Sequence, residues 1–272
     1  MKVLTDRAFS ARNINFGNRM NDKYKSIKIN TTMKGKIVKA IIGLGVLLSV
    51  CSNYNVNAQS LNDIDGNHYK TIKHGMQEWT ANNLNVTRFR NGDLIPEART
   101  KDEWIDLGSK GKPAWCYYDN DSVIGKTLGK LYNWYAINDP RGLAPEGWHI
   151  PVNQDWRTLV KNLLGLDVAG LKLKSTTGWK KSGSNKIGFS ALPAGFRTEK
   201  ADFKGLGSKA QWWSNSEPVD VIKSDQIYSL MLNDFTMEVS YLKMEKGAGL
   251  SVRCLKDIMP LKVSAADSLS SF

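Results

Sequence analysis

Large aromatic residues recur beside glycine and proline in the middle of the chain, and this pattern limits how the chain can fold. Residues 129–136 read GKLYNWYA, residues 145–151 read PEGWHIP, and Trp212 and Trp213 stand side by side. Glycine and proline favour turns, whereas aromatic rings bury large apolar surfaces at defined angles. The sequence therefore predicts a loop-rich domain in which a few short helices and strands are fixed by ring packing.

The net charge of +12 is unevenly distributed along the chain. Residues 1–58 hold ten lysines and arginines against two aspartates, a contribution of +8, and the remaining 214 residues contribute +4. A protein that binds nucleic acid needs its basic residues on the folded domain. The distribution therefore argues against a nucleic acid as the partner.

Residues 1–58 have the order of a secretory signal. Lysines precede an apolar run at residues 40–50, and residues 56–58 (VNA) supply small side chains before a cleavage site. The run is shorter than the ~20 residues that a membrane-spanning helix needs. We expect an exported protein that begins near Gln59, and the alternative is that the run is a buried helix of the domain.

Two details of this leader have alternatives. A start at Met33 would give a signal of ordinary length and make residues 1–32 an extension. Cys51 follows Leu48, Ser49 and Val50, and a bacterial lipoprotein is cut before such a cysteine, which then receives lipid. Because Val50 is bulkier than the usual small residue there, cleavage after Ala58 is preferred over a lipid anchor at Cys51.

Cys116 and Cys254 remain as an even pair in an oxidising compartment. A disulfide between them is the simplest prediction, and closure of so long a loop would contribute about 4 kcal/mol. The alternative is two buried free thiols. Two cysteines so far apart do not resemble a zinc site, which needs four ligands.

The apolar spacing predicts helices over residues 126–138 and 153–164. Residues 92–111 are expected to form a long surface loop, and residues 258–272 a loose tail. Three strands of a small antiparallel sheet are expected at residues 211–214, 227–232 and 250–255. Because no linker divides the rest of the chain, residues 59–257 are predicted to form one domain.

Few residues suggest catalysis. His149 lies between Trp148 and Ile150, a setting typical of a packed or partly exposed histidine rather than of a general base. The chain carries no Gly-x-Ser-x-Gly elbow and no phosphate-binding loop. We therefore predict no catalytic residue.

Three consecutive oxygen-bearing side chains form a candidate calcium ligand set. They are Asp119, Asn120 and Asp121, and Ca²⁺ prefers such oxygens. The segment lacks the glycine and the distant glutamate of an EF-hand, so a hydrated turn is favoured over a calcium site. No other cofactor is predicted.

Many segments of the chain, in the same order, resemble the Fibrobacter succinogenes major paralogous domain family. They are Trp79 with Asn83 and Leu84, residues 129–136, residues 145–151 with Trp156, residues 188–197 (GFSALPAGFR), Trp212 to Ser214, and residues 251–257. The resemblance implies an exported, often lipid-anchored protein with an α+β fold distantly similar to C-type lectins and the formylglycine-generating enzyme. That fold has two helices, a short antiparallel sheet whose terminal strands lie together, and a long irregular loop region.

The resemblance also bears on the cysteines. Many family members carry a cysteine where this chain has Ala144. In the C-type lectin plan the cysteine of the terminal strand, here Cys254, bonds back to the region of the first helix. Without a cysteine at position 144, this plan leaves Cys116 as the partner.

Two short segments are similar to the sequence motifs that bind calcium and sugar in C-type lectins. They are Glu217 with Pro218, and Asn233 with Asp234. Neither motif is complete. Val219 replaces the polar residue expected after Glu217 and Pro218, and Leu232 stands where the motif of Asn233 and Asp234 has tryptophan. Glu217, Asn233 and Asp234 are therefore candidates for a ligand site on the basis of an incomplete motif.

Two classes of function follow. The first is a binding module without catalysis, whose loops around Trp179, Trp212 and Trp213 contact an extracellular glycan or protein by ring stacking. Adjacent strand residues face opposite sides, so one of the paired tryptophans is expected to be available. The second is an enzyme related to formylglycine generation, which would need a reactive thiol of low pKa at Cys116.

Overall fold

The computed structural model describes residues 60–216 and 226–258. The chain divides into two units, Met1–Asn57 and Ala58–Phe272, and every described residue belongs to the second. Several sequence predictions lie outside the described residues: the signal, the start at Met33, Cys51, Glu217 and residues 259–272 of the predicted tail.

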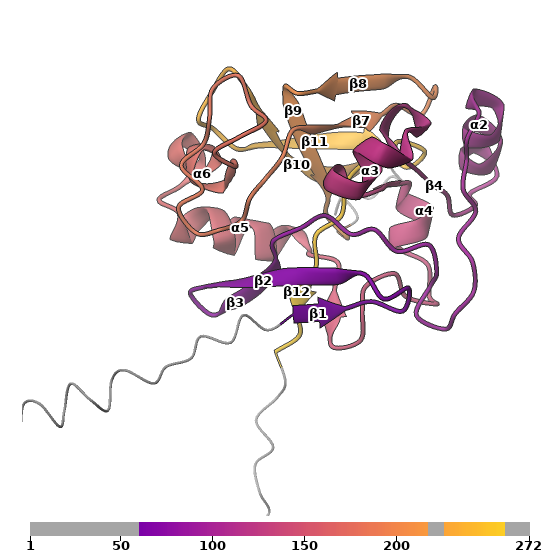
Figure 1. Ribbon diagram of the computed structural model, residues 1–272, viewed down its shortest axis with the longest axis horizontal. Helices are drawn as coiled ribbons and strands as arrows, with labels where there is room; N and C mark the ends of the chain where they lie inside the picture. The colour runs from indigo at the N-terminus through magenta and orange to yellow at the C-terminus, as the bar shows by residue number, and fades with distance from the viewer. Residues whose placement is uncertain (1–59, 217–225, 259–272) are drawn as a thin grey trace, which may run out of the picture. The chain divides into compact units, whose positions relative to one another are not determined.

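Two five-stranded sheets form the framework (Figure 1). The first contains, in order, β1 (Ser60–Asn62), β2 (His68–His74), β3 (Gln77–Thr80), β12 (Leu255–Lys256) and β6 (Trp148–His149), all antiparallel. The second contains β11 (Ser240–Glu245), β10 (Gln226–Asn233), β9 (Lys209–Trp213), β7 (Ala194–Arg197) and β8 (Phe203–Leu206), with β7 and β9 parallel. A separate pair joins β4 (Trp115–Cys116) to β5 (Leu131–Tyr132).

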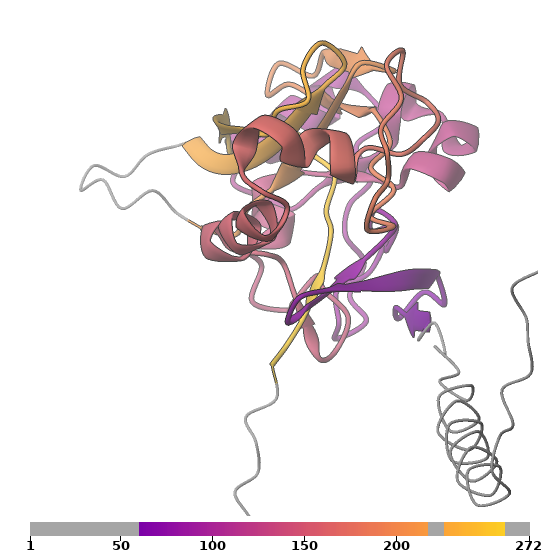
Figure 2. The same ribbon diagram turned by 90° about the vertical axis from the view of Figure 1, so that its left-hand side faces the viewer.

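Short helices flank these sheets. They are α2 (Lys101–Ser109), the 3-10 helix η2 (Tyr118–Asn120), α3 (Ser122–Leu128), α4 (Trp134–Ile137), α5 (Asn153–Asn162) and α6 (Leu166–Leu173). Figures 1 and 2 place α5 and α6 together at one side, away from α2, α3 and α4. The fold is therefore α+β as expected, but its described part has more helices than the predicted two. None of the helices within the described residues is long and apolar enough to cross a bilayer.

The predicted surface loop at residues 92–111 is wrong over its second half, which forms α2. The Thr100 side chain accepts from the Glu103 backbone N–H at 3.1 Å, and the Glu103 carboxylate accepts from the Thr100 N–H at 2.9 Å. This reciprocal capping box satisfies amides that a helix start leaves unpaired. Trp104 is fully buried and Leu107 packs against the same hydrophobic cluster, so these two side chains fasten the helix to the core.

The predicted helix at residues 126–138 is broken into α3, β5 and α4. Gly129 has a φ of +77°, and a Cβ there would lie 2.9 Å from the Leu84 carbonyl oxygen. The chain therefore leaves the helix where it must pass close to another backbone segment. Asn133 then begins α4, because its side chain accepts from the Ala136 N–H at 3.0 Å.

The helix predicted at residues 153–164 is confirmed as α5. Its apolar stripe is buried through Trp156, Leu159 and Val160. Asp155 fixes its start by accepting from the Val152 N–H at 2.9 Å. The following helix, α6, was not predicted.

Two of the three predicted strands form the expected antiparallel pair, as β9 and β10. The third prediction is wrong, because residues 249–256 do not form one strand beside them. This closing segment, yellow in Figure 1, runs from the second sheet to the first. Its Gly249 bridges Arg197, and its Leu255 pairs with both Trp79 and His149.

Buried cations replace regular hydrogen bonding where the loops converge. Arg253 donates to the Thr80 and Phe189 carbonyls at 2.8 and 3.0 Å, with its guanidinium 4.5 Å from the Phe189 ring centre. Arg197 donates to the Ala98 and Thr100 carbonyls, both at 3.0 Å. Burial lowers the pKa of Arg253 to about 9. Irregular backbone can be buried here because the guanidinium groups satisfy its carbonyls.

Candidate functional site

The three tryptophans predicted to bind a ligand are buried. Trp212 and Trp213 are both fully buried, and Trp179 is 6% exposed. Each indole N–H group has a partner inside the protein. That of Trp212 donates to Asn83 Oδ1 at 2.9 Å, that of Trp213 to the Tyr132 carbonyl at 2.7 Å, and that of Trp179 to the Ala191 carbonyl at 2.8 Å.

The expectation that one of the paired tryptophans faces solvent is wrong because β9 has a core on each side. Trp212 packs with Trp156 and Phe189 in one hydrophobic cluster, and Trp213 belongs to another. Alternation along the strand therefore places each ring in a different core. Ring stacking on a ligand by these tryptophans is excluded in this fold.

The side chains considered for calcium are engaged in local structure. Asp121 caps α3 by accepting from the Val123 N–H at 2.7 Å, and Asn120 donates to the Arg99 carbonyl at 2.6 Å. Asp119 is exposed in a left-handed turn with a φ of 51°.

Asn233 and Asp234, which resemble part of the C-type lectin motif, are also engaged in local hydrogen bonds. The Asn233 side chain accepts from the Phe235 and Thr236 N–H groups, and buried Asp234 accepts from the Lys181 N–H at 2.9 Å. Across residues 60–216 and 226–258, no three His, Cys, Asp or Glu side chains gather into a metal-binding group. Asn120, Asp121, Asn233 and Asp234 are therefore engaged in local hydrogen bonds.

The predicted disulfide is absent, and Cys116 and Cys254 are buried free thiols. They belong to different hydrophobic clusters, since Cys116 packs with Ala98 and Trp104 while Cys254 packs in the cluster that contains Ala144. Burial raises the pKa of each thiol to about 12. The sequence argument failed because an even number of cysteines carries no information about which clusters contain them.

His149 joins three elements through hydrogen bonds. Its Nδ1 lies 2.6 Å from Asp257 Oδ1, and its Nε2 lies 3.3 Å from Asp155 Oδ2. The Asp155 hydrogen bond raises the pKa of His149, partial burial opposes this shift, and Asp257 adds to it. Both ring nitrogens face carboxylates, so the histidine ties β6 and α5 to Asp257, which directly follows the closing segment. The His149 side chain is partly exposed, as the sequence predicted.

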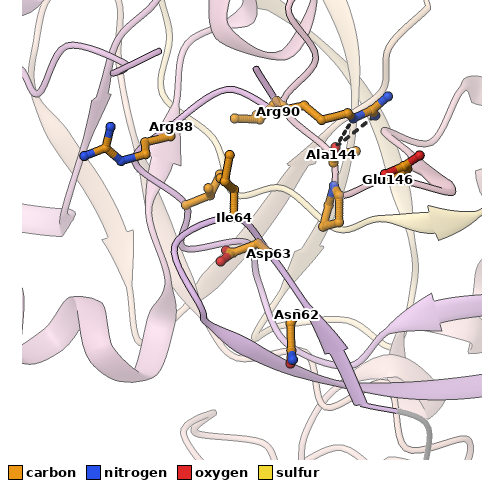
Figure 3. Close-up of a pocket in the computed structure, with 10 residues that line it drawn as sticks. Asn62, Asp63, Ile64, Arg88, Arg90, Ala144 and Glu146 are labelled. Atoms are coloured by element: carbon orange, nitrogen blue, oxygen red, sulfur yellow. Dashed lines mark hydrogen bonds between the residues drawn. The ribbon is translucent and has the colours of Figure 1, made fainter. Parts of the chain in front are cut away.

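A pocket of 320 Å³ is built from three segments that are distant in sequence (Figure 3). The first is the turn between β1 and β2, which Asp63 organises. One carboxylate oxygen of Asp63 accepts from the Asp65 and Asn67 N–H groups at 3.0 and 2.9 Å. The other oxygen accepts from the Tyr69 hydroxyl at 2.6 Å. The pocket wall at Asn62 to Ile64 is therefore held by a dense local network.

The second segment follows β3 and contributes Val86, Arg88 and Arg90. Arg88 pairs with Asp65 at 3.5 Å, which joins this segment to the turn. Arg90 donates through Nε and Nη2 to the Ala144 carbonyl at 3.1 and 2.9 Å. Arg90 thereby links the second segment to the third.

The third segment is the loop that contributes Leu143, Ala144, Pro145 and Glu146. In Figure 3, Ile64 and Asp63 lie between Arg88 on one side and Glu146 on the other. Glu146 is exposed and has no ion-pair partner among the described residues. The pocket therefore offers both positive and negative groups around walls that are partly apolar.

A buried lysine connects the pocket to the core. Lys130 donates from Nζ to the Asn85 carbonyl at 2.6 Å and to Asn85 Oδ1 at 2.8 Å. Its ammonium lies 4.6 Å from the Trp115 ring centre, and Asn67 also donates to the Asn85 carbonyl at 3.3 Å. Burial lowers the pKa of Lys130 to about 8, while the carboxylates of the turn oppose that shift.

The sequence did not identify this pocket. Its segments carry turn residues such as Asp65 and Gly66, but nothing local indicates that Arg88, Arg90 and Glu146 meet. The pocket arises where the aromatic-rich loops converge, so its residues could be grouped only once the fold was known.

Comparison with known proteins identifies the family. A model of the Fibrobacter succinogenes major domain matches residues 72–256, and the chain belongs to this family. The match includes the second and third segments of the pocket and all of the closing segment. No curated protein and no solved structure matches the chain.

Proposed function

We propose that this protein is an exported binding module that holds a polar extracellular ligand, a glycan unit or a short part of a protein, in the pocket of Figure 3. The pocket itself carries the proposal. Its volume of 320 Å³ lies in the range of small-molecule sites, and polar groups converge on it from three segments.

The chemistry of the lining suits a saccharide best. Arginine donates in a planar fork and carboxylates accept, so together they can pair with neighbouring sugar hydroxyls. Ile64, Val86 and Leu143 offer apolar surface for the C–H faces of a sugar ring. This replaces the stacking role that the sequence suggested for tryptophans.

A catalytic role has less support than a binding role. An enzyme related to formylglycine generation needs a thiolate, and burial raises the pKa of both thiols to about 12. His149 is engaged by two carboxylates. We therefore propose binding without turnover.

We also propose that the fold is C-type-lectin-like. The pairing of β12 with β3 supports this, because that plan joins the strands near the two ends of the domain. An experimental structure in which these two strands are apart would contradict the proposal.

Export is proposed from the leader in the sequence. Because the excess of positive charge lies in residues 1–58, we do not propose a nucleic acid as partner. Mass spectrometry of the exported form should give Gln59 as the first residue or, with a lipid anchor, a modified Cys51; an intact Met1 in the cytoplasm would contradict export.

A glycan array probed with the chain from Gln59 to Phe272 tests the binding function. Glycans that bind should lose at least tenfold in affinity with Glu146→Gln and with Ile64→Ser. The matched controls are Glu238→Gln and Val123→Ser, which change exposed residues outside the pocket and should have no effect. Equal binding by pocket variants and controls would reject the pocket, and thiol-dependent turnover of any substrate would reject the binding module.

A further inference from the structure

A second concave surface lies between α5, the start of α6 and β11. This groove has a volume of 570 Å³. It shares no residue with the pocket of Figure 3. Its lining consists of Arg157, Val160, Lys161, Leu164, Gly165, Leu166 and Tyr241.

The groove presents leucines to solvent at the junction of the two helices. Leu164 is 79% exposed and Leu166 is 46% exposed. Leu164 has a φ of 73°, in the left-handed region where glycine is the usual residue after a helix. The Gly165 N–H donates to the Val160 carbonyl at 3.0 Å, so the helix end is closed by backbone bonds that do not need a leucine. A large apolar side chain therefore stands in a strained, exposed position that folding does not explain.

Positive charge lines the same groove. Arg157 and Lys161 are exposed on α5, and neither forms an ion pair with another described residue. Four residues along a helix bring the two side chains to the same face, about 6 Å apart along the axis. The Tyr241 hydroxyl lies covered beside them without a hydrogen-bond partner among the described residues.

We propose that this groove is a docking site for a short acidic segment of a partner protein, with apolar side chains against Leu164 and Leu166 and carboxylates facing Arg157 and Lys161. Alternate residues of an extended peptide lie about 7 Å apart, which suits the separation of the two cations. An acyl chain brings a single carboxylate and so leaves one cation without a partner.

A second copy of this chain fits the charges poorly. A twofold dimer places the same patch on both sides of the interface, so that Arg157 and Lys161 would face their own copies. Like charges opposed in this way disfavour association.

Selection from a random heptapeptide library displayed on phage, with the full chain as bait, tests the proposal. The enriched peptides should combine acidic and apolar residues, and their affinity should fall as salt rises. Measured by fluorescence polarisation, Arg157→Glu combined with Lys161→Glu should weaken binding at least tenfold. The exposed controls Lys200→Glu and Leu94→Ser should leave it unchanged.

Leu164→Gly separates docking from folding. Glycine adopts a positive φ without strain, so this variant should melt at the same temperature as the wild type or higher, yet bind the peptides at least fivefold more weakly. The proposal is overturned if the enriched peptides lack acidic residues or bind all variants equally. Competition by dodecanoate that depends on Arg157 would assign the groove to acyl chains, and self-association that Leu164→Gly abolishes would assign it to a second copy.

Discussion

Replacement of Asn83 by alanine should destabilise the protein strongly, because this side chain joins the closing segment to α3 and to β9. Its Nδ2 donates to the Leu128 carbonyl at 2.8 Å and to Ser251 Oγ at 3.2 Å. Its Oδ1 accepts from Trp212 Nε1 at 2.9 Å and from Arg253 Nε at 2.8 Å. Asn83 is 8% exposed, so water cannot readily replace these bonds.

The magnitude follows from the groups that lose a partner. A buried donor or acceptor left unpaired costs about 1–3 kcal/mol, and a charged one costs more. Because the guanidinium of Arg253 keeps its bonds to carbonyls, we expect a total loss of about 4 kcal/mol in the free energy of unfolding. For a domain of this size, that corresponds to a decrease in Tm of about 8–16 °C.

Urea unfolding followed by tryptophan fluorescence measures this loss, and Asn82 supplies the control. Asn82 is exposed and makes one long contact, 3.4 Å from Lys70 N to its Oδ1. Asn82→Ala should therefore cost no more than about 0.5 kcal/mol, as surface substitutions usually do. If Asn83→Ala lowers stability no more than Asn82→Ala does, the hydrogen bonds of Asn83 do not hold the closing segment in place.

Three further predictions concern pH, thiols and helix packing. The folded state raises the pKa of His149 above its ordinary 6.5. The stabilisation of the folded protein by this histidine is therefore complete below pH 6.5 and is lost as the pH rises through the folded-state pKa. His149→Gln should remove this pH dependence from urea titrations, and an unchanged pH profile would contradict the prediction. Cys116 and Cys254 should react with Ellman's reagent after unfolding in urea but not in the native state, and rapid native reaction would contradict their burial. Gly170→Ala should lower Tm, because the added Cβ would lie 2.5 Å from two backbone oxygens. Gly108→Ala is the control: its Cβ would have its nearest contact at 3.5 Å, so this variant should raise stability by about 0.5–1 kcal/mol. Equal shifts in the two variants would refute the packing argument.

Local signals predicted the elements that local interactions determine. Helix α5 could be recognised because its apolar stripe, its acidic first turn and its glycine stop agree. The capping box of Thr100 and Glu103 was equally visible in the sequence, although the weak apolar period of α2 concealed the helix.

The predictions that proved wrong concern segments whose structure is determined by tertiary contacts. Residues 126–138 have helical spacing, but the close approach of Gly129 to Leu84 interrupts the helix. The alternation rule was correct for Trp212 and Trp213, yet it assumed a sheet with one buried face, and β9 has two. The pocket residues come from three segments whose meeting depends on the whole fold, so no local pattern could group them.

The closing segment affects the order in which this protein can fold. Residues 249–256 supply the partner of β3 and β6 in one sheet and bridge Arg197 and Trp212 in the other. Contacts between residues so distant in sequence form late, after the loop entropy between them has been overcome. The two halves of the core therefore cannot be sealed until nearly the whole chain has been synthesised. Because β12, the last strand of the described residues, joins β3 to β6, the first sheet stays incomplete until that strand has emerged, and an open chain of this kind is what the proposed export would require.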